Sequence, residues 1–144
     1  MQDTPDEDAI RELVHTYADA VNRRDAEDWG ALWTEDGVWE AFGQAFEGRE
    51  RVVATWQGAM QSFSLVFHVS HHGVLQVEGD TAHGRWTTSE QLKGADGTPG
   101  ILLALYHDDY RRDAGRWRFA RRRLEVLYQG PPDLTGKPAA RRDD

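Results

Sequence analysis

The sequence predicts an α+β domain in which helices gather on one face of a mostly antiparallel sheet. In the first part of the chain, three segments carry apolar residues at helical spacing, and a short strand lies between the second and the third. From Phe67 onward, four segments alternate with a period of two, and turn residues divide them into two hairpins. This order, helix-helix-strand-helix followed by four strands, is typical of an α+β fold.

A chain of 144 residues is long enough for one domain with a substantial core. We assign residues 1–129 to that domain and residues 130–144, which are rich in Pro, Gly and charge, to an extended or disordered tail. Six Trp, five Phe and four Tyr residues supply large apolar side chains for the core. The absence of cysteine excludes a disulfide framework, a zinc site with Cys ligands and a thiol nucleophile.

Composition also limits the expected partners and compartment. The start of the chain is acidic without the apolar core of a signal peptide, and no apolar run approaches membrane-spanning length, so we expect a cytoplasmic protein with no membrane partner. The net charge of −8 opposes non-specific binding to nucleic acid. The basic run of residues 116–124 alternates as a strand, so its arginines can pair with nearby acidic residues, and we expect no nucleic-acid partner.

The first helix starts at residues 4–7 (TPDE), with Thr4 as the N-cap and Pro5 in the first turn. Behind this start, apolar residues recur at helical spacing and form one buried stripe: Ile10, Leu13, Val14, Tyr17 and Val21. Tyr17 therefore points toward the core, whereas Asn22 comes at the end of the helix.

Two short elements and a third helix follow. Asp25 caps a short second helix, whose apolar face consists of Trp29, Leu32 and Trp33. Residues 34–37 (TEDG) predict a turn, and residues 38–42 predict a strand that Gly43-Gln44 turns back through Ala45-Phe46. Residues 48–61 predict the third helix, through the apolar residues Val52, Val53, Trp56 and Met60.

A hairpin over residues 67–92 is the centre of the predicted sheet. Its strands meet at Gly79-Asp80, a two-residue turn that tolerates positive φ. Pairing the strands about this turn sets Val77 opposite Ala82, Leu75 opposite Gly84, and Gly73 opposite Trp86. The period of two adds three further residues to the same, largely apolar face: His71, Thr88 and Glu90. The other face carries polar side chains that we assign to solvent: Gln76, Glu78, Thr81, His83 and Arg85.

After a loop over residues 94–100, the segments 101–112 and 116–128 predict a second hairpin that turns at Asp113-Ala114-Gly115. Its strands carry three aromatic residues that offer a surface for self-association: Tyr110, Trp117 and Phe119.

These segments together resemble the SnoaL-like branch of the nuclear-transport-factor-2-like superfamily. The resemblance rests on residues 10–43, the helix start EGRERV, the FHVSHH and VEGDTAHGRW parts of the central hairpin, and the closing YRRDAGRWRFARRRL. Over roughly residues 8–128 the chain looks most like the scytalone dehydratase and bile-acid 7α-dehydratase group. The resemblance implies a cone-shaped roll, in which a strongly curved sheet wraps three helices around an internal apolar pocket, and it implies sheets that pair in a homodimer or higher oligomer. It does not specify the reaction, because the superfamily includes dehydratases, a dehydrochlorinase, isomerases, cyclases, epoxide hydrolases and non-catalytic chains.

The dehydratase pattern also implies catalytic residues. The family's catalytic histidine falls on His68, its helix tyrosine on Tyr17, and an acidic pocket residue on Glu90. The aspartate that partners the histidine in those dehydratases falls on Asn22, which is a departure from the pattern. An Asn can hold an imidazole by hydrogen bonding but cannot stabilise an imidazolium by charge, so Glu90 is the remaining candidate for the charge partner.

Strand alternation and the resemblance disagree about which histidine faces the pocket. Counting in twos from Leu75 puts His71 on the pocket face and His68 on the other. A bulge near Ser70-His71 would reverse this, and bulges are frequent beside active sites. We favour His68, while a structural histidine bonded to backbone remains the alternative. On a regular strand His68 and His72 would share a face without an acidic third ligand, so we expect no metal, and no cofactor motif is present.

Two functional classes fit these observations. The first is a cofactor-independent lyase, dehydratase or isomerase that removes a proton next to the carbonyl of a cyclic, largely apolar small molecule. His68, Tyr17, Asn22 and Glu90 would act in it, and its pocket wall would include His71, Leu75, Trp86, Thr88 and Trp56. A polyketide-cyclase-like enzyme is a variant of this class. The second is a non-catalytic ligand-binding or assembly module, in which Tyr17 is a core aromatic residue and Asn22 a helix C-cap.

Overall fold

The computed structural model describes residues 5–140 and has the predicted α+β architecture. Its helices are α1 (Pro5–Arg23), α2 (Ala26–Gly30) and α3 (Arg49–Met60). Its strands are β1 (Trp33–Ala41), β2 (Gln44–Glu47), β3 (Phe63–Glu78), β4 (Thr81–Gly94), β5 (Pro99–Asp113) and β6 (Arg116–Gly130). None of the helices within residues 5–140 has the length and apolar character needed to cross a membrane.

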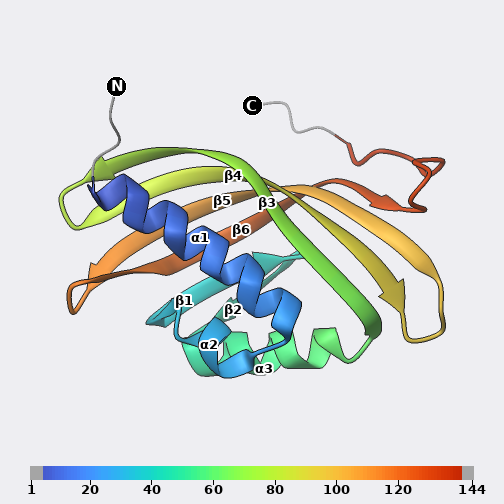
Figure 1. The fold of residues 1–144 in the computed structure, drawn as a ribbon, viewed down its shortest axis with the longest axis horizontal. Helices are drawn as coiled ribbons and strands as arrows, with labels where there is room; N and C mark the ends of the chain where they lie inside the picture. The colour runs from blue at the N-terminus through green and yellow to red at the C-terminus, as the bar shows by residue number, and fades with distance from the viewer. Residues whose placement is uncertain (1–4, 141–144) are drawn as a thin grey trace.

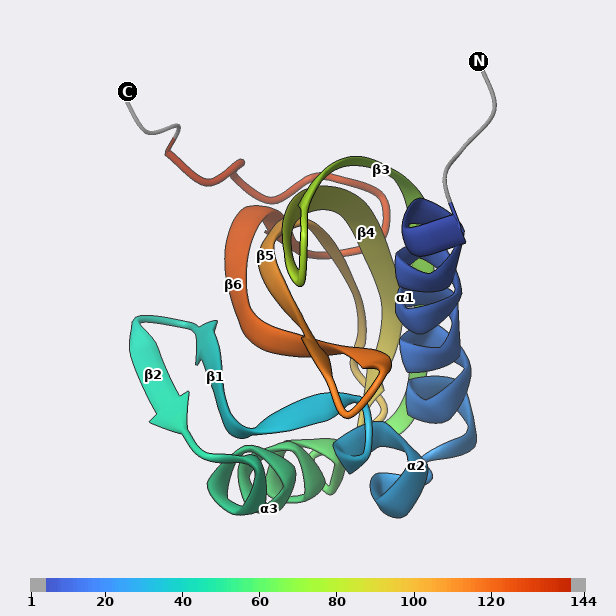
Figure 2. The same ribbon diagram turned by 90° about the vertical axis from the view of Figure 1, so that its left-hand side faces the viewer.

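The six strands form one curved, unclosed sheet in the order β2-β1-β6-β5-β4-β3. Neighbouring strands are antiparallel except β1 and β6, which run parallel, so the sheet is mixed. Strands as long as β3 to β6 accumulate a large right-handed twist, which coils the sheet. Figure 2 shows the result: the sheet curls around an interior, α1 lies beside β3 at one side, and α2 and α3 lie below β1 (Figure 1).

Helix α1 forms because its apolar residues make one continuous stripe, which is buried as predicted. The buried positions are Ile10, Leu13, Val14, Tyr17, Ala20 and Val21. Acidic residues fill its first turn, where they interact favourably with the positive end of the helix dipole. The predicted N-cap, Thr4, lies outside the described residues. After Arg23 the chain leaves the helix through Arg24, whose φ of 54° is left-handed.

The segment after α1 differs from the prediction. Asp25 caps α2, and its side chain accepts a hydrogen bond from the Asp28 amide at 2.9 Å. However, α2 ends at Gly30, and Trp33 begins β1 by pairing with Phe119 of β6. The predicted turn at residues 34–37 lies inside β1, where the register with β6 shifts between Trp33 and Val38. Residues 34–37 therefore form an irregularity within β1. They are not a turn between helix α2 and the strand.

The aromatic residues of the second hairpin face inward, which corrects the predicted self-association surface. Tyr110, Trp117 and Phe119 are 1%, 8% and 0% exposed and belong to the core. Tyr110 and Phe119 lie on paired strands with their rings 5.6 Å apart. These side chains cannot form an interface, so a homodimer stays a prediction that rests on the family resemblance.

The described part of the C-terminal segment, residues 131–140, has no helix or strand but is hydrogen-bonded to β6. The Tyr128 hydroxyl donates to the carbonyl of Pro131 at 2.8 Å and accepts from the amide of Gly136 at 3.0 Å. The amide of Ala139 donates to the carbonyl of Leu127 at 3.0 Å. This segment thus covers the Tyr128 ring, which is 5% exposed.

The central hairpin has the predicted register on both sides of its turn. Gly73 lies opposite Trp86, and a methyl group at Gly73 would come within 2.4 Å of the Trp86 ring, so the indole packs flat against the glycine backbone. Trp86 is 2% exposed, and its indole N–H donates to the Tyr110 hydroxyl at 2.9 Å.

Trp86→Ala should therefore lower the free energy of unfolding by about 3–5 kcal/mol, because it removes a fully packed ring. Urea unfolding monitored by circular dichroism measures this change. A variant as stable as the unmodified protein would show that the indole is not part of the core.

Candidate active site

A single β-bulge decides which histidine enters the interior. The register of β3 on β4 shifts between Ser70 and His72, so His71 is an extra residue. On the N-terminal side of this shift, His68 lies opposite Glu90. The His68 side chain is 3% exposed. His71 is exposed instead, and its Nε2 lies 2.7 Å from Ser89 Oγ. The prediction that His71 lines the pocket is thus wrong, because the alternation counted from Leu75 does not continue through a bulge.

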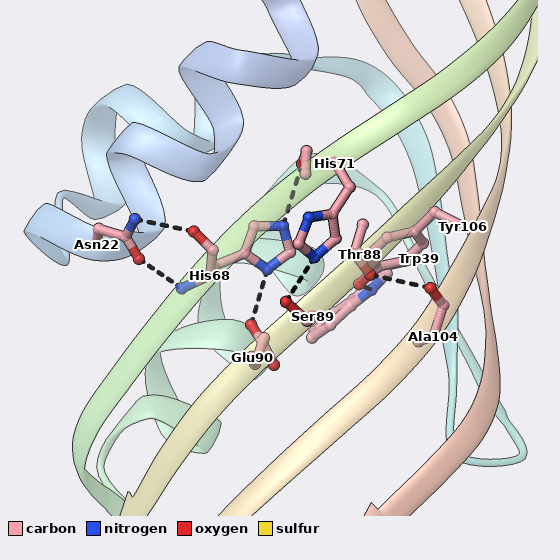
Figure 3. A network of polar contacts seen from close by, with 10 residues as sticks. Asn22, Trp39, His68, His71, Thr88, Ser89, Glu90, Ala104 and Tyr106 are labelled. Atoms are coloured by element: carbon pink, nitrogen blue, oxygen red, sulfur yellow. Dashed lines mark hydrogen bonds and ion pairs between the residues drawn. The ribbon is translucent and has the colours of Figure 1, made fainter.

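Asn22 fixes the backbone of His68, not its ring (Figure 3). Its side-chain amide donates to the His68 carbonyl at 3.0 Å and its side-chain oxygen accepts from the His68 N–H at 2.7 Å. β3 is an edge strand, so its outward N–H and C=O groups have no neighbouring strand, and Asn22 satisfies one pair of them. The amide side chain suits this role because its donor and its acceptor are on two separate atoms. The expectation that Asn22 replaces an imidazole partner is therefore corrected.

Glu90 is the partner of the His68 ring. The sequence suggested this, because Asn22 stands where the dehydratases have their aspartate and Glu90 was the remaining acidic candidate. His68 Nδ1 lies 2.9 Å from Glu90 Oε2 (Figure 3). An ionised carboxylate only accepts a hydrogen bond, so this contact favours the tautomer in which Nδ1 donates to Glu90, and in the neutral ring Nε2 then keeps its lone pair. Nε2 is 3.4 Å from Ser70 Oγ, a long contact that leaves it available to another proton donor. This arrangement prepares Nε2 to act as a base.

His68 and Glu90 line a small internal cavity of about 100 Å³ between α1, α3 and the sheet. Its other walls are mostly apolar or aromatic: Tyr17, Val21, Trp39, Trp56, Met60, Phe63, Val66, Leu92, Leu102, Tyr106 and Leu124. Thr88 and Gln129 are polar residues of the same lining. Phe42 also lines it while 61% exposed, so its ring lies at the mouth.

Two buried phenols form a polar wall of the cavity. The indole N–H of Trp39 donates to the Tyr106 hydroxyl at 3.1 Å, and the rings of Tyr106 and Tyr17 lie 6.3 Å apart in an edge-to-face arrangement. Burial raises the pKa of Tyr17, and it raises the pKa of Tyr106 well above its ordinary value. Both groups therefore stay neutral and can donate a hydrogen bond to an oxygen atom in the cavity. The rings of Tyr17 and His68 lie 5.6 Å apart, which places donor and base side by side.

A buried ion pair supports these phenols from behind. Arg122 and Asp108 form two parallel hydrogen bonds, of 2.8 and 3.0 Å, and both side chains are fully buried. The guanidinium lies over the rings of Tyr17 and Tyr106, 4.5 and 3.9 Å from their centroids. The Tyr110 hydroxyl donates to Asp108 at 2.6 Å. The positive charge of Arg122 lowers the pKa of Tyr17, against the larger effect of burial.

The remaining predicted site residues divide into two groups. Trp56 and Thr88 line the cavity, and Trp56 also stacks on Trp29 at a centroid distance of 4.6 Å. Leu75 and Trp86 pack in or against the core outside that lining, so the structure does not bring them to the site. Within residues 5–140, no three His, Asp or Glu side chains come together in a way that could hold a metal ion.

The sequence alone did not identify Tyr106 or the buried Asp108–Arg122 pair as parts of the site. A signal for Tyr106 and Asp108 was present, because they continue the alternation of Leu102 and Ala104 on the inner face of β5. Arg122 gave no such signal, because the register of β5 and β6 shifts between Phe119 and Arg121. The alternation that buries Trp117 and Phe119 therefore does not continue to Arg122.

Replacing Asn22 tests the backbone clamp. Asn22→Asp keeps the acceptor for the His68 N–H but loses the donor to the His68 carbonyl, and it places a carboxylate beside that oxygen. We expect both Asn22→Asp and Asn22→Ala to lower the free energy of unfolding by about 1–2 kcal/mol, as measured by urea unfolding. An Asn22→Asp variant of unchanged or increased stability would contradict the clamp.

Alkaline titration tests the environment of the phenols. Burial raises the pKa of three of the four tyrosines: Tyr17, Tyr106 and Tyr110. A tyrosine whose pKa is higher in the folded state than its ordinary value of about 10 stabilises the fold at pH values below that ordinary value. This stabilisation is lost as the pH rises through the pKa of the folded state. We expect tyrosinate absorbance from these three residues to appear only together with unfolding. Their ionisation near pH 10 (about the ordinary value) in a folded protein would contradict their burial.

Comparison with known proteins places this geometry in a family. A model of the SnoaL-like domain matches residues 2–123. No curated protein matches the chain significantly. A solved structure of a protein of unknown function from Mycobacterium tuberculosis is 29% identical, with a TM-score of 0.75 over 82% of this chain and 74% of the other.

Two further structures share the fold at lower identity. A candidate scytalone dehydratase from Novosphingobium aromaticivorans DSM 12444 is 22% identical, with a TM-score of 0.83 over 96% of this chain and 95% of the other. The hexachlorocyclohexane dehydrochlorinase LinA-type3 from Novosphingobium barchaimii LL02 is 20% identical, with a TM-score of 0.78 over 95% of both chains. Because the domain model spans most of the sequence, this protein belongs to the SnoaL-like domain family.

Proposed function

We propose that this protein is a cofactor-independent lyase or isomerase that removes a proton next to the carbonyl of a small cyclic, largely apolar molecule. The observation that carries the proposal is the His68 imidazole, which lines a mostly apolar cavity while Glu90 holds its Nδ1 at 2.9 Å. A structural histidine bonded to backbone would place its ring nitrogens on main-chain atoms, whereas this ring bonds to a carboxylate. Dehydration and dehydrochlorination, the reactions in the names of two structural relatives, are both eliminations.

The proposed first step is proton transfer from carbon to His68. Nε2 accepts the proton from the carbon next to the carbonyl, and the electron pair of that C–H bond moves onto the carbonyl oxygen. The imidazolium that forms carries a positive charge, which the Glu90 carboxylate stabilises from the Nδ1 side. Since the histidine side chain is 3% exposed, water competes little for the proton.

The Tyr17 hydroxyl is placed to stabilise the enolate oxygen. Tyr17 lines the cavity and burial raises the pKa of its hydroxyl, so the O–H stays protonated and can donate to a substrate oxygen. Arg122, 4.5 Å from the Tyr17 ring, adds a positive field from behind. Donors already aligned in a dry site stabilise developing charge without reorganising.

The second step determines the class of reaction. In a dehydratase, the enolate expels the hydroxyl group from the next carbon, and that group takes the proton from Nε2 and leaves as water. In an isomerase, the same proton returns to a different carbon. Glu90 Oε1 makes no hydrogen bond within the described residues, so it can orient a polar group of the substrate.

The cavity limits the size of the substrate. Its volume of about 100 Å³ is below the roughly 150 Å³ that holds a benzene molecule. A six-membered ring therefore fits only when side chains at the mouth move outward. Phe42 can do so, because it is 61% exposed and lies in the turn between β1 and β2. We therefore propose a substrate with a single ring.

Hydrogen exchange tests the proton-transfer step without requiring the leaving group to be known. Cyclic ketones and cyclic β-hydroxy ketones are incubated with the protein in D₂O, and NMR follows deuterium entering the carbon next to the carbonyl as well as loss of water. His68→Gln keeps hydrogen-bonding capacity but cannot accept the proton, so we expect the rate to fall by about 10²–10⁴-fold.

His71→Gln is the matched control, because it removes an exposed imidazole three residues along the same strand. It should leave the rate unchanged. Equal rates for His68→Gln and the unmodified protein would contradict the assignment of the base. Saturable ligand binding without exchange or elimination would instead favour the non-catalytic binding module.

A further inference from the structure

The face of the sheet that points away from the cavity carries a second hollow. It is a cleft of about 540 Å³ over β4, β5 and β6, which makes it larger than the internal cavity. Its charged walls include Arg85, His107, Asp109, Arg121 and Arg123. None of these residues takes part in the proposed chemistry of His68.

Three basic side chains form a row across this cleft. Arg85 of β4 lies directly opposite His107 of β5, and His107 lies directly opposite Arg123 of β6. Adjacent strands are about 4.8 Å apart, so the row brings two guanidinium groups to either side of one imidazole. An anion bound across the row could interact with both guanidinium groups.

The other charged groups of the cleft already have partners. Arg121 is paired with Glu40, and His83 Nδ1 lies 2.7 Å from Asp109 Oδ1, so that carboxylate is engaged. His107 Nε2 lies 2.8 Å from Glu125 Oε1.

Arg85 and Arg123 are different, because neither guanidinium group forms an ion pair or side-chain hydrogen bond with any residue of the described range 5–140. Arg123 is nevertheless only partly exposed. In a chain of net charge −8, two unpaired guanidinium groups beside an imidazole give a local region of positive charge.

We propose that this cleft binds a small organic anion through a phosphate or carboxylate group held between Arg85 and Arg123. The planar guanidinium fork matches the oxygen pairs of both groups, and two forks facing one anion can each donate two hydrogen bonds. The imidazole of His107 lies between them and marks the centre of the site. The cleft volume leaves room for the organic part of such a ligand beside Val74 and Leu75. This site is independent of the catalytic proposal for His68.

The test uses the full chain and two probes, inorganic phosphate and acetate. NMR follows the side-chain N–H signals of arginine and the imidazole signals of His107 during titration. We expect saturable shifts of Arg85, Arg123 and His107 with at least one probe. Arg85→Gln and Arg123→Gln should each weaken binding about tenfold or more, since each removes charge-assisted hydrogen bonds.

Arg116→Gln is the matched control, because it removes one exposed arginine of β6 that does not line the cleft. It should leave the dissociation constant unchanged. Saturable binding of phosphate but not of acetate would show that the cleft prefers ligands with a phosphate group. Saturable binding of both probes would show that it accepts either a phosphate or a carboxylate group. Absence of saturation with both probes at millimolar concentration, or equal weakening by Arg116→Gln, would overturn the proposal.

Discussion

The site depends on one extra residue in β3. A regular strand would turn His68 to the outer face and His71 inward, because side chains alternate with a period of two. The bulge between Ser70 and His72 reverses this for the part of β3 that contacts α1. Asn22 then fixes the reversed segment by hydrogen-bonding both backbone groups of His68, so that the imidazole meets Glu90 across the strands. The clamp and the bulge together hold the ring of the proposed base in one orientation.

The second constraint is the burial of Arg122. An unpaired charge in the interior would cost several kcal/mol, on the order of the whole stability of a small domain. The bidentate bonds to Asp108 and the faces of Tyr17, Tyr106 and Phe119 offset this cost. The consequence for the cavity is that its phenols face a fixed positive charge. An oxygen atom held by Tyr17 therefore lies in a field that favours negative charge, which is what proton removal next to a carbonyl requires.

Much of the fold could be predicted from the sequence, and the reasons are local. The Gly79-Asp80 turn determines the register of the central hairpin as far as Trp86, and the apolar stripe of α1 determines its buried face. Alternation alone could not locate the bulge at His71, because a bulge depends on how the strand pairs with its neighbour; a bulge near Ser70-His71 entered only as an alternative that reconciled alternation with the family resemblance. The inward direction of Tyr110 and Phe119 and the role of Asn22 depend on contacts between residues far apart in the chain. The family resemblance pointed to His68, Tyr17 and Glu90 as site residues. In the structure all three line one cavity.

The central claim is that Glu90 fixes the tautomer of His68 and leaves Nε2 as a free base. Long-range ¹H–¹⁵N NMR of the protein with labelled histidine measures this directly, since a protonated ring nitrogen and a bare one have different ¹⁵N shifts. We expect His68 to carry its proton on Nδ1, and we expect Glu90→Gln to shift the ¹⁵N signal of His68 Nδ1 more than the ring ¹⁵N signals of any other histidine. A His68 ring protonated on Nε2, with Nδ1 as the acceptor, would contradict it.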